Sequence, residues 1–249
     1  MSNINDTFFD GEYKEIWRSI IPDELTVKEV DFMLSHFSLQ PGSKVLDLMC
    51  GYGRHAIALA RKGMLVTAVD NLGDYTNEIY EIAEKEQLTL KVVKADVTAY
   101  KNNDKADLVI CMGNSINFFN AGDVTKIFAD ISDSLKAGGH LLINSWSVAE
   151  IAFKNFKEKS WSSIGGLKFL SDSQFFFQPT RIETESIIIS SNGDTETKTG
   201  IDYIFSINEM EAMLNQAGLV LKEVYSIPGK KKFTLGEPRA YLVAEKILP

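Results

Sequence analysis

The strongest signal in the chain is a short glycine-containing segment, KVLDLMCGYGRHA, at residues 44–56. Residues 44–48 are mostly apolar, which is typical of a parallel strand that is buried on both faces. Gly51 and Gly53 allow a sharp turn and a close approach of the backbone to a ligand. Apolar residues follow Arg54 at helical density, so free N–H groups of a helix N-terminus point beyond the strand end. The segment therefore predicts a strand, a turn and a helix that together favour an anionic ligand group.

Two ligand classes fit this turn. The spacing Gly51-x-Gly53-x-x-Ala56 matches the G-x-G-x-x-G/A pattern of dinucleotide-binding folds. The amino-acid carboxylate of S-adenosylmethionine (SAM) would fit the same turn. A helix that merely needs a tight entry is a third interpretation. The turn alone does not decide among the three, so the rest of the chain has to.

Strand and helix patterns alternate along the first 144 residues after an aromatic-rich segment, 1–22, that is expected to be irregular. Helices are predicted at 23–37, 54–63, 76–86 and 121–135, and strands after the first at 64–70, 90–94, 107–112 and 140–144. This alternation is typical of a parallel, doubly wound sheet with right-handed crossovers.

The pattern changes after Glu150. Alternating β-rich segments are predicted at 168–177, 181–190 and 197–205, with a hairpin turn at Ser191-Asn-Gly-Asp194. A helix at 208–218 follows, and segments 219–226 and 240–246 are expected to form an antiparallel hairpin across a loop with Pro228-Gly229.

We therefore expect one α/β domain, 1–249, with a Rossmann-like, doubly wound, seven-stranded sheet and an antiparallel C-terminal hairpin. Its core half would span 23–150. An antiparallel β insertion at 151–206 would cover the acceptor side, and the closing helix and hairpin would occupy 207–249.

Composition limits the partners and the location. A net charge of -8, with Lys230-Lys231-Lys232 as the one basic cluster, argues against nucleic acid. Met1–Asp6 lacks the layout of a signal peptide and no apolar run reaches membrane-spanning length, so a cytoplasmic protein is expected. Cys50 and Cys111 fall at predicted buried strand ends and suggest no disulfide framework. The three histidines lack metal-ligand spacing, so no metal is expected.

Four marks, in order, resemble the class I SAM-dependent methyltransferases. They are VLDLMCGYG at 45–53, Val69-Asp70, Lys94-Ala-Asp96, and DLVI at 107–110 followed by LKAGGHLL at 135–142. A dinucleotide enzyme would explain the first two marks but not the last two. The one departure is Cys50, which stands where the family usually has its first glycine. The resemblance covers about 13–144 and the terminal hairpin, and it implies a SAM-dependent methyltransferase.

The resemblance also implies which residues bind SAM and its product S-adenosylhomocysteine (SAH). Asp70, at the end of the second strand, would accept both ribose hydroxyls, and Asp96 would accept from the adenine amine. Asp47 would fix the glycine turn or meet the amino group of SAM through water. The expected cofactor set is Tyr13, Asp47, Met49, Gly51, Gly53, Asp70, Asn71, Asp96, Val97, Met112 and Gly113.

Several points stay open at the level of sequence. Asp70 could be a solvated strand-end acid and Asp96 a helix cap, and His55 is expected to be an exposed first-turn residue. The oligomeric state is not determined. A SAM-binding module without catalysis and a nucleotide-dependent oxidoreductase remain alternatives to the enzyme.

The acceptor is expected to be a small molecule that is methylated on nitrogen or oxygen. Residues 111–115, CMGNS, resemble the end of the fourth strand in glycine N-methyltransferase-like enzymes, which suggests a small polar acceptor. Tyr13 and Trp17 would share a face of a short helix and either cover SAM as a lid or pack in the core. The sequence names no catalytic base. The acceptor-site candidates are Trp17, Asn114, Arg181, Tyr203 and Arg239.

Overall fold

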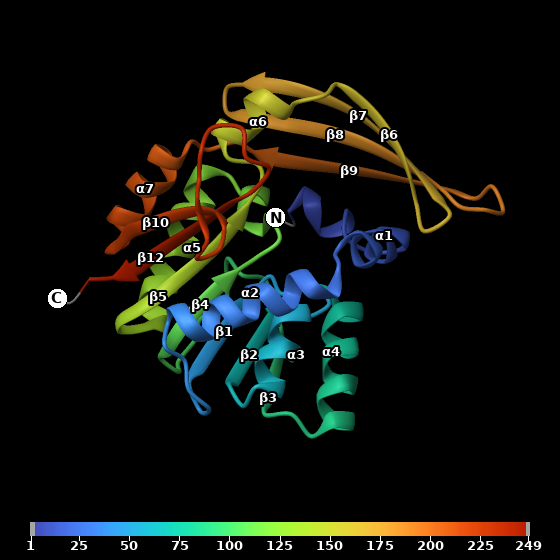
Figure 1. The fold of residues 1–249 in the computed structure, drawn as a ribbon. Coiled ribbons are helices and arrows are strands. Elements are labelled where there is room, and N and C mark those ends of the chain that lie inside the picture. The colour runs from blue at the N-terminus through green and yellow to red at the C-terminus, as the bar shows by residue number, and fades with distance from the viewer. Residues whose placement is uncertain (1–2, 248–249) are drawn as a thin grey trace.

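The computed structural model describes residues 3–247, which form two β-sheets with helices around the larger one (Figure 1). The larger sheet has the strand order β11-β10-β12-β5-β4-β1-β2-β3. Its strands are β1 (Lys44–Leu48), β2 (Leu65–Asp70), β3 (Leu90–Lys94), β4 (Ala106–Cys111), β5 (Leu135–Ser145), β10 (Leu219–Ile227), β11 (Lys231–Lys232) and β12 (Ala240–Lys246).

The predicted doubly wound sheet is confirmed. Strands β3, β2, β1, β4 and β5 pair in parallel, and β12 and β10 add the antiparallel hairpin at one side. The sheet has eight strands rather than seven, because the two-residue β11 pairs with the edge of β10 inside the predicted loop. A pair of exposed lysines carries no strand pattern, so this short strand was not predicted.

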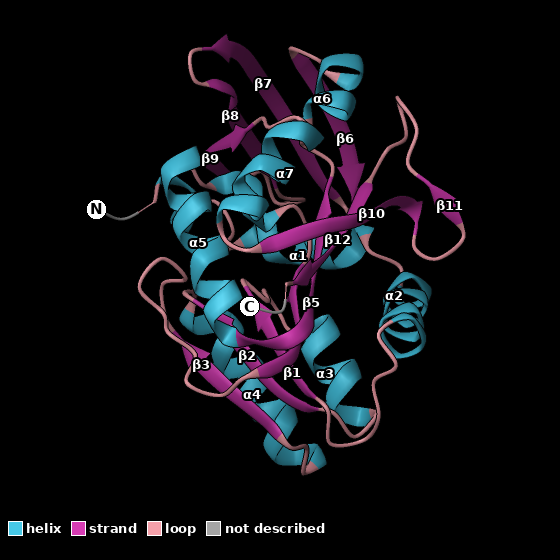
Figure 2. Ribbon diagram, turned by 90° about the vertical axis from the view of Figure 1, so that its left-hand side faces the viewer, coloured by secondary structure: helices cyan, strands magenta, loops and turns pink. Residues whose placement is uncertain are grey.

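Helices cover both faces of the larger sheet, with α5 on one side and α2 and α3 on the other in Figure 2. The helices are α2 (Asp23–His36), α3 (Arg54–Arg61), α4 (Gly73–Glu86), α5 (Ala121–Ser134) and α7 (Ile207–Gln216). Neighbouring residues of β4 belong to different layers: Val109 is in the apolar cluster that contains Phe128 of α5, whereas Leu108 is in the cluster that contains Met33 of α2 and Leu59 of α3. Each such fully buried side chain stabilises the fold by about 1.5–3 kcal/mol.

The second sheet is antiparallel and lies over one end of the larger sheet (Figure 1). Its strands are β6 (Lys159–Ile164), β7 (Leu167–Phe177), β8 (Thr180–Ile189) and β9 (Thr195–Tyr203), preceded by α6 (Ala149–Asn155). Strands β7 to β9 agree with the predicted β insertion, but β6 and α6 were missed. Strand β6 is a mostly exposed edge strand with only two apolar residues, Trp161 and Ile164, so it lacks the alternation that reveals a strand.

Residues 4–20 of the N-terminal segment are mostly helical, and the expectation that this segment is irregular was wrong. It forms a 3-10 helix, η1 (Ile4–Thr7), and a helix, α1 (Glu12–Ile20). Helix α1 is strongly amphipathic, since it buries Ile16 and exposes Glu12 and Glu15. Glu12 and Glu15 also lie in its first turn, where acidic side chains are favourable. None of the helices within residues 3–247 is long and apolar enough to cross a membrane.

Candidate active site

The glycine turn joins β1 to α3 through an unusual backbone path. Met49, Gly51 and Gly53 all have positive φ angles, of 55°, 55° and 75°. A Cβ atom on Gly53 would lie 2.6 Å from Cγ1 of Ile79 in α4, so only glycine fits there. A Cβ on Gly51 would have no atom within 4 Å, because this residue borders a cavity. The two glycines therefore have different roles: Gly53 allows close packing and Gly51 leaves room.

Asp70, the last residue of β2, fastens this turn from the neighbouring strand. Its Oδ2 accepts from the Gly51 N–H at 2.8 Å, and its Oδ1 accepts from the Leu72 N–H at 3.0 Å. The side chain is buried, and burial raises its pKa against the opposing effect of these N–H donors. The expected alternative of a solvated strand-end acid is therefore excluded by the geometry.

Asp47 lies at the centre of the sheet and has an unmet hydrogen-bonding capacity. It is 1% exposed, and its Oδ2 has no hydrogen-bond partner among residues 3–247. Burial raises its pKa to about 8, the charge of Arg54 lowers it, and the charge of Asp70 raises it further. Because the pKa is near 8, the free group is mostly protonated near pH 7, and a cationic ligand group in the adjoining cavity would stabilise its ionised form and satisfy Oδ2.

His55 is buried, and the prediction that it would be exposed was wrong. Glu29 of α2 reaches the first turn of α3 and accepts from His55 Nε2 at 2.9 Å and from Arg54 Nη1 at 2.6 Å. The same carboxylate accepts from the Tyr241 hydroxyl at 2.7 Å. A contact between residues 26 positions apart in sequence leaves no local signal, which explains the error.

This cluster places a neutral histidine beside an ionised glutamate. Burial lowers the pKa of His55 to about 4, helped by the charge of Arg54 and opposed by Glu29, so the imidazole is neutral near pH 7. Burial alone would raise the pKa of Glu29, but its donors outweigh that effect and lower it to about 2. The ionised Glu29 thus anchors α2 beneath the glycine turn.

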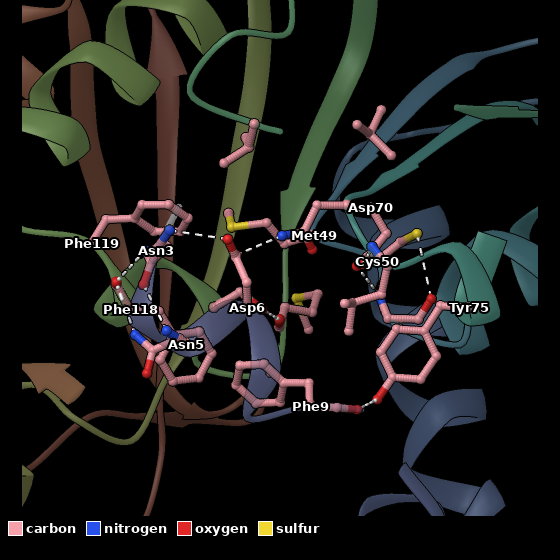
Figure 3. Close-up of a pocket in the computed structure, with 18 of the residues that line it drawn as sticks. Asn3, Asn5, Asp6, Phe9, Met49, Cys50, Asp70, Tyr75, Phe118 and Phe119 are labelled. Carbon is pink, nitrogen blue, oxygen red and sulfur yellow. Dashed lines mark hydrogen bonds between the residues drawn. The ribbon is translucent and has the colours of Figure 1, made fainter. Parts of the chain in front are cut away.

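A cavity of about 580 Å³ lies at the carboxyl ends of β1, β2 and β4, which is the usual ligand position in this kind of sheet. Figure 3 shows side chains from the N-terminal segment, the glycine turn and η2 (Ser115–Phe118) converging on it. Every expected cofactor residue except Gly53 lines this cavity: Tyr13, Asp47, Met49, Gly51, Asp70, Asn71, Asp96, Val97, Met112 and Gly113. Asp96 is exposed, and its Oδ1 accepts from the Thr98 N–H and hydroxyl, both at 2.8 Å.

The acceptor-site candidates divide into two groups. Trp17 and Tyr203 line the cavity, whereas Asn114, Arg181 and Arg239 do not. Arg181 lies over the ring of Phe176 and pairs with Glu183 at 2.7 Å, so its guanidinium is held on the insertion. Asn114 is 1% exposed, and its amide is fully used within the protein.

The N-terminal segment lines the cavity, and most of its contribution was missed. Asp6 accepts from Asn71 Nδ2 at 2.6 Å, and the Phe9 carbonyl accepts from the Tyr75 hydroxyl at 2.7 Å. On the other side Asn5 is 4% exposed and bonds the carbonyls of Phe118 and Ile201. Further lining residues that the sequence did not reveal include Asn3, Cys50, Tyr52, Arg54, Phe119 and Trp146. For the residues of segment 1–22, the high density of aromatic side chains was a sequence signal that could have indicated a place at the cavity.

Comparison with known proteins identifies the domain around the glycine turn. Residues 45–139 match a family model described as a methyltransferase domain. The chain is 35% identical over 102 residues to hemagglutinin 1 of Eikenella corrodens, which covers 41% of this chain and 34% of that protein. It is 27% identical to the glycine/sarcosine N-methyltransferase of Halorhodospira halochloris, over 55% of this chain and 52% of that protein. It is 30% identical to the glycine/sarcosine N-methyltransferase of Aphanothece halophytica, over 53% of this chain and 51% of that protein. The chain thus spans between a third and about half of the length of these relatives.

Solved structures share the fold over nearly the whole chain. A SAM-dependent methyltransferase from Clostridium acetobutylicum superimposes with a TM-score of 0.82 at 18% identity, covering 95% of this chain and 96% of that one. A SAM-bound amino pentose methyltransferase from Micromonospora echinaspora gives 0.72 at 17% identity, covering 95% and 97%. The shared architecture therefore extends well beyond residues 45–139.

Proposed function

We propose that this chain, a member of the class I SAM-dependent methyltransferases, transfers the methyl group of SAM to a nitrogen or oxygen atom of a small molecule. The single observation that carries the proposal is the cavity itself. It is lined jointly by the glycine turn, the buried Asp47, the strand-end Asp70 and several aromatic side chains. The net charge of -8 further supports a small-molecule acceptor over nucleic acid.

The residues around the glycine turn fit SAM. Asp47 has the unpartnered carboxylate oxygen that suits an ammonium group, and Asp70 suits ribose hydroxyls at the end of β2. Gly51 presents open space where a side chain would intrude. When bound, SAM supplies a methyl group on a positively charged sulfur, which is already activated for transfer to a nucleophile.

The protein's own task is to align the acceptor and to exclude water. The N-terminal segment, which Asn5 and Asp6 hold between β9 and the start of α4, lines the cavity and would shield a bound ligand from water. Tyr13 and Trp17 line the cavity from α1, where their ring faces suit a positive charge. The glycine/sarcosine N-methyltransferases among the relatives support nitrogen as the acceptor atom. The two free cysteines support a reducing location such as the cytoplasm.

Titration calorimetry with SAM, SAH and NAD, followed by detection of SAH formed with a panel of small amines and alcohols, tests the proposal. We expect SAM and SAH to bind in the micromolar range, NAD not to bind, and at least one panel member to produce SAH. Binding of NAD without SAM would instead indicate an oxidoreductase. Binding of SAM with no turnover across the panel and cell metabolite mixtures would favour a non-catalytic module.

A further inference from the structure

The residues that line the cavity along the carboxyl edge of the larger sheet change in character from β3 to β5. Asp96 follows β3, Asp70 ends β2 and Asp47 lies in β1, whereas Gly113 follows β4 and Trp146 follows β5. These strands are neighbours in the order β3-β2-β1-β4-β5, so the end of β5 lies about 10 Å from the end of β1. Carboxylates thus occur at three adjacent strands, and the residues directly after the other two are uncharged.

The remaining charged residues that line the cavity are Asp6, Arg54 and Asp123. All three are tied to the side of β1, β2 and β3. Asp6 accepts from Asn71 at the end of β2, and Arg54 is the first residue of α3, directly after the glycine turn. Asp123 is in the first turn of α5, a helix from which a lysine donates to the Thr98 carbonyl after β3. The part of the cavity beside β4 and β5 is therefore free of these charges.

Trp146 is held at that part of the cavity by the loop after β4. Asn114 Oδ1 accepts from the N–H groups of Trp146 and Ser147, both at 3.0 Å. Its Nδ2 donates to the Ser147 hydroxyl at 2.8 Å and to Asp202 at 2.7 Å. Asn114 is 1% exposed, and neither it nor its two side-chain partners line the cavity. This buried junction therefore positions Trp146 without presenting a charge to a ligand.

Trp17 of α1 meets Trp146 beside Gly113. The two ring centroids are 5.3 Å apart, and the ring planes are inclined by 42°. Trp17 Cζ2 lies 3.8 Å from the position of a Cβ on Gly113, so glycine leaves space beside this ring. Both tryptophans are half-buried, as are Tyr13 and Tyr203, which also line the cavity. We call these four residues, Tyr13, Trp17, Trp146 and Tyr203, the aromatic surface.

We propose that the acceptor stacks a ring on Trp17 and Trp146, so that the substrates of this protein are ring-bearing compounds without a carboxylate. This inference rests on the proposed function and names its substrate class. Aromatic faces pack favourably against the face of another ring, and their π-systems also attract a neighbouring ammonium group.

A carboxylate on the acceptor would have no basic partner at the aromatic surface. Among residues 3–247, Arg54 is the one positively charged side chain that lines the cavity, since the low pKa of His55 keeps it neutral near pH 7. Arg54 lies at the glycine turn and already donates to Glu29 at 2.6 Å. A carboxylate that leaves water for a site without a counter-ion loses its hydration with little in return. Free amino acids are therefore disfavoured as acceptors.

Matched pairs of probes test the two requirements by calorimetry with the protein loaded with SAH. Phenethylamine and n-octylamine have equal numbers of carbon atoms but differ in the ring, and glucosamine and its open-chain alditol differ in ring closure. Phenethylamine and phenylalanine, tyramine and tyrosine, and glucosamine and its uronic acid differ in a carboxylate. We expect at least one ring probe to be methylated with SAM and to bind about tenfold more tightly than its partners of both kinds.

The decisive variants are Trp17→Leu and Trp146→Leu, and the matched control is Trp161→Leu, at a position on the insertion that is 74% exposed. We expect each decisive variant to raise KM for the ring probe about tenfold and to keep the SAH affinity within about threefold. The preference for phenethylamine over n-octylamine should shrink in the same two variants. Trp161→Leu should change none of these quantities. A tryptophan that serves only to pack the fold would weaken both amines equally.

Trp17→Phe and Trp146→Phe keep a ring face at each position, so KM should stay within about threefold of the parent value. If a leucine variant loses SAH binding, the phenylalanine variants and the probe pairs on the unmodified protein decide the question. Equal affinity within every pair, no binding by any ring probe, or an unaltered KM in both leucine variants would each overturn the inference. Failure of the unmodified protein to bind SAM or SAH would contradict the proposed function instead. Cofactor binding without a preference for rings would contradict only the role of the aromatic surface.

Discussion

The two ends of the cavity are built in different ways. The end at the glycine turn comes largely from residues 44–56, which are contiguous in sequence, together with Asp70 on the adjacent strand. The aromatic end combines Tyr13, Trp146 and Tyr203, which are separated by more than 50 positions along the chain. One end is thus carried largely by one local element, whereas the aromatic end depends on elements that meet only in the folded chain. The following predictions test this contrast.

The largest effect on stability is expected for Gly53→Ala, because the backbone of the turn packs directly against α4 at this glycine. The added Cβ would overlap Ile79 at 2.6 Å and force an alanine to a φ of 75°. Backbone strain and overpacking together should lower the free energy of unfolding by about 3–5 kcal/mol. Urea denaturation measures it. Gly42→Ala is the matched control, since Gly42 has a φ of 91° but open space around it, and a similar loss there would show that strain alone is responsible.

Asp70→Ala should weaken SAM binding without unfolding the protein. The variant removes a charged acceptor for the ribose and also the bond that fastens the Gly51 N–H. A loss of about 1.5–3 kcal/mol, or roughly 10- to 150-fold in Kd, is expected from calorimetry. Asp74→Ala, an exposed acid in the first turn of α4, serves as the control. Unaltered affinity in Asp70→Ala would remove β2 from the cofactor site.

Stability should fall as the pH drops from 6.5 to 5, because of His55. Its pKa is about 4 in the folded chain and about 6.5 when unfolded, so the unfolded chain binds more protons in this window. The expected loss is about 2 kcal/mol over that range. His55→Gln keeps an N–H donor for Glu29 but cannot titrate, so its stability should be flatter with pH. An equally steep slope in this variant would assign the effect to other groups.

The smallest effect is expected for Asn5→Ala, which loosens the N-terminal segment at the aromatic end of the cavity. Asn5 donates to the carbonyls of Phe118 and Ile201 and accepts from the Ile201 N–H at 2.8 Å. Losing these bonds should ease local opening by about 1 kcal/mol, so amides of residues 3–20 should exchange about fivefold faster. Adding SAH should slow this exchange in the parent protein. Asn215→Ala, an exposed position in α7, is the control, and identical exchange in both variants would contradict a lid role for the segment.

Much of the fold was predictable because its signals are local. The apolar runs of β1, β2 and β4 and the helical spacing of α2 and α5 each lie within a few residues of sequence, so the doubly wound sheet could be inferred. The glycine turn and the acid that ends β2 were found for the same reason. Strand β6 and α1 were missed, since one has few apolar residues and the other gains its order from packing over the cavity.

The sequence by itself therefore determined the order of the elements and the end of the cavity that the glycine turn forms. Only the tertiary structure decided that His55 is buried against Glu29 and that Asn114 does not line the cavity. It also decided that Asn114 donates a hydrogen bond to Asp202, which lies 88 positions further along the chain. The physical reason is that hydrogen bonds between distant residues depend on how layers pack, which leaves no period or spacing in the chain. The aromatic end of the cavity is built almost wholly from contacts of that kind.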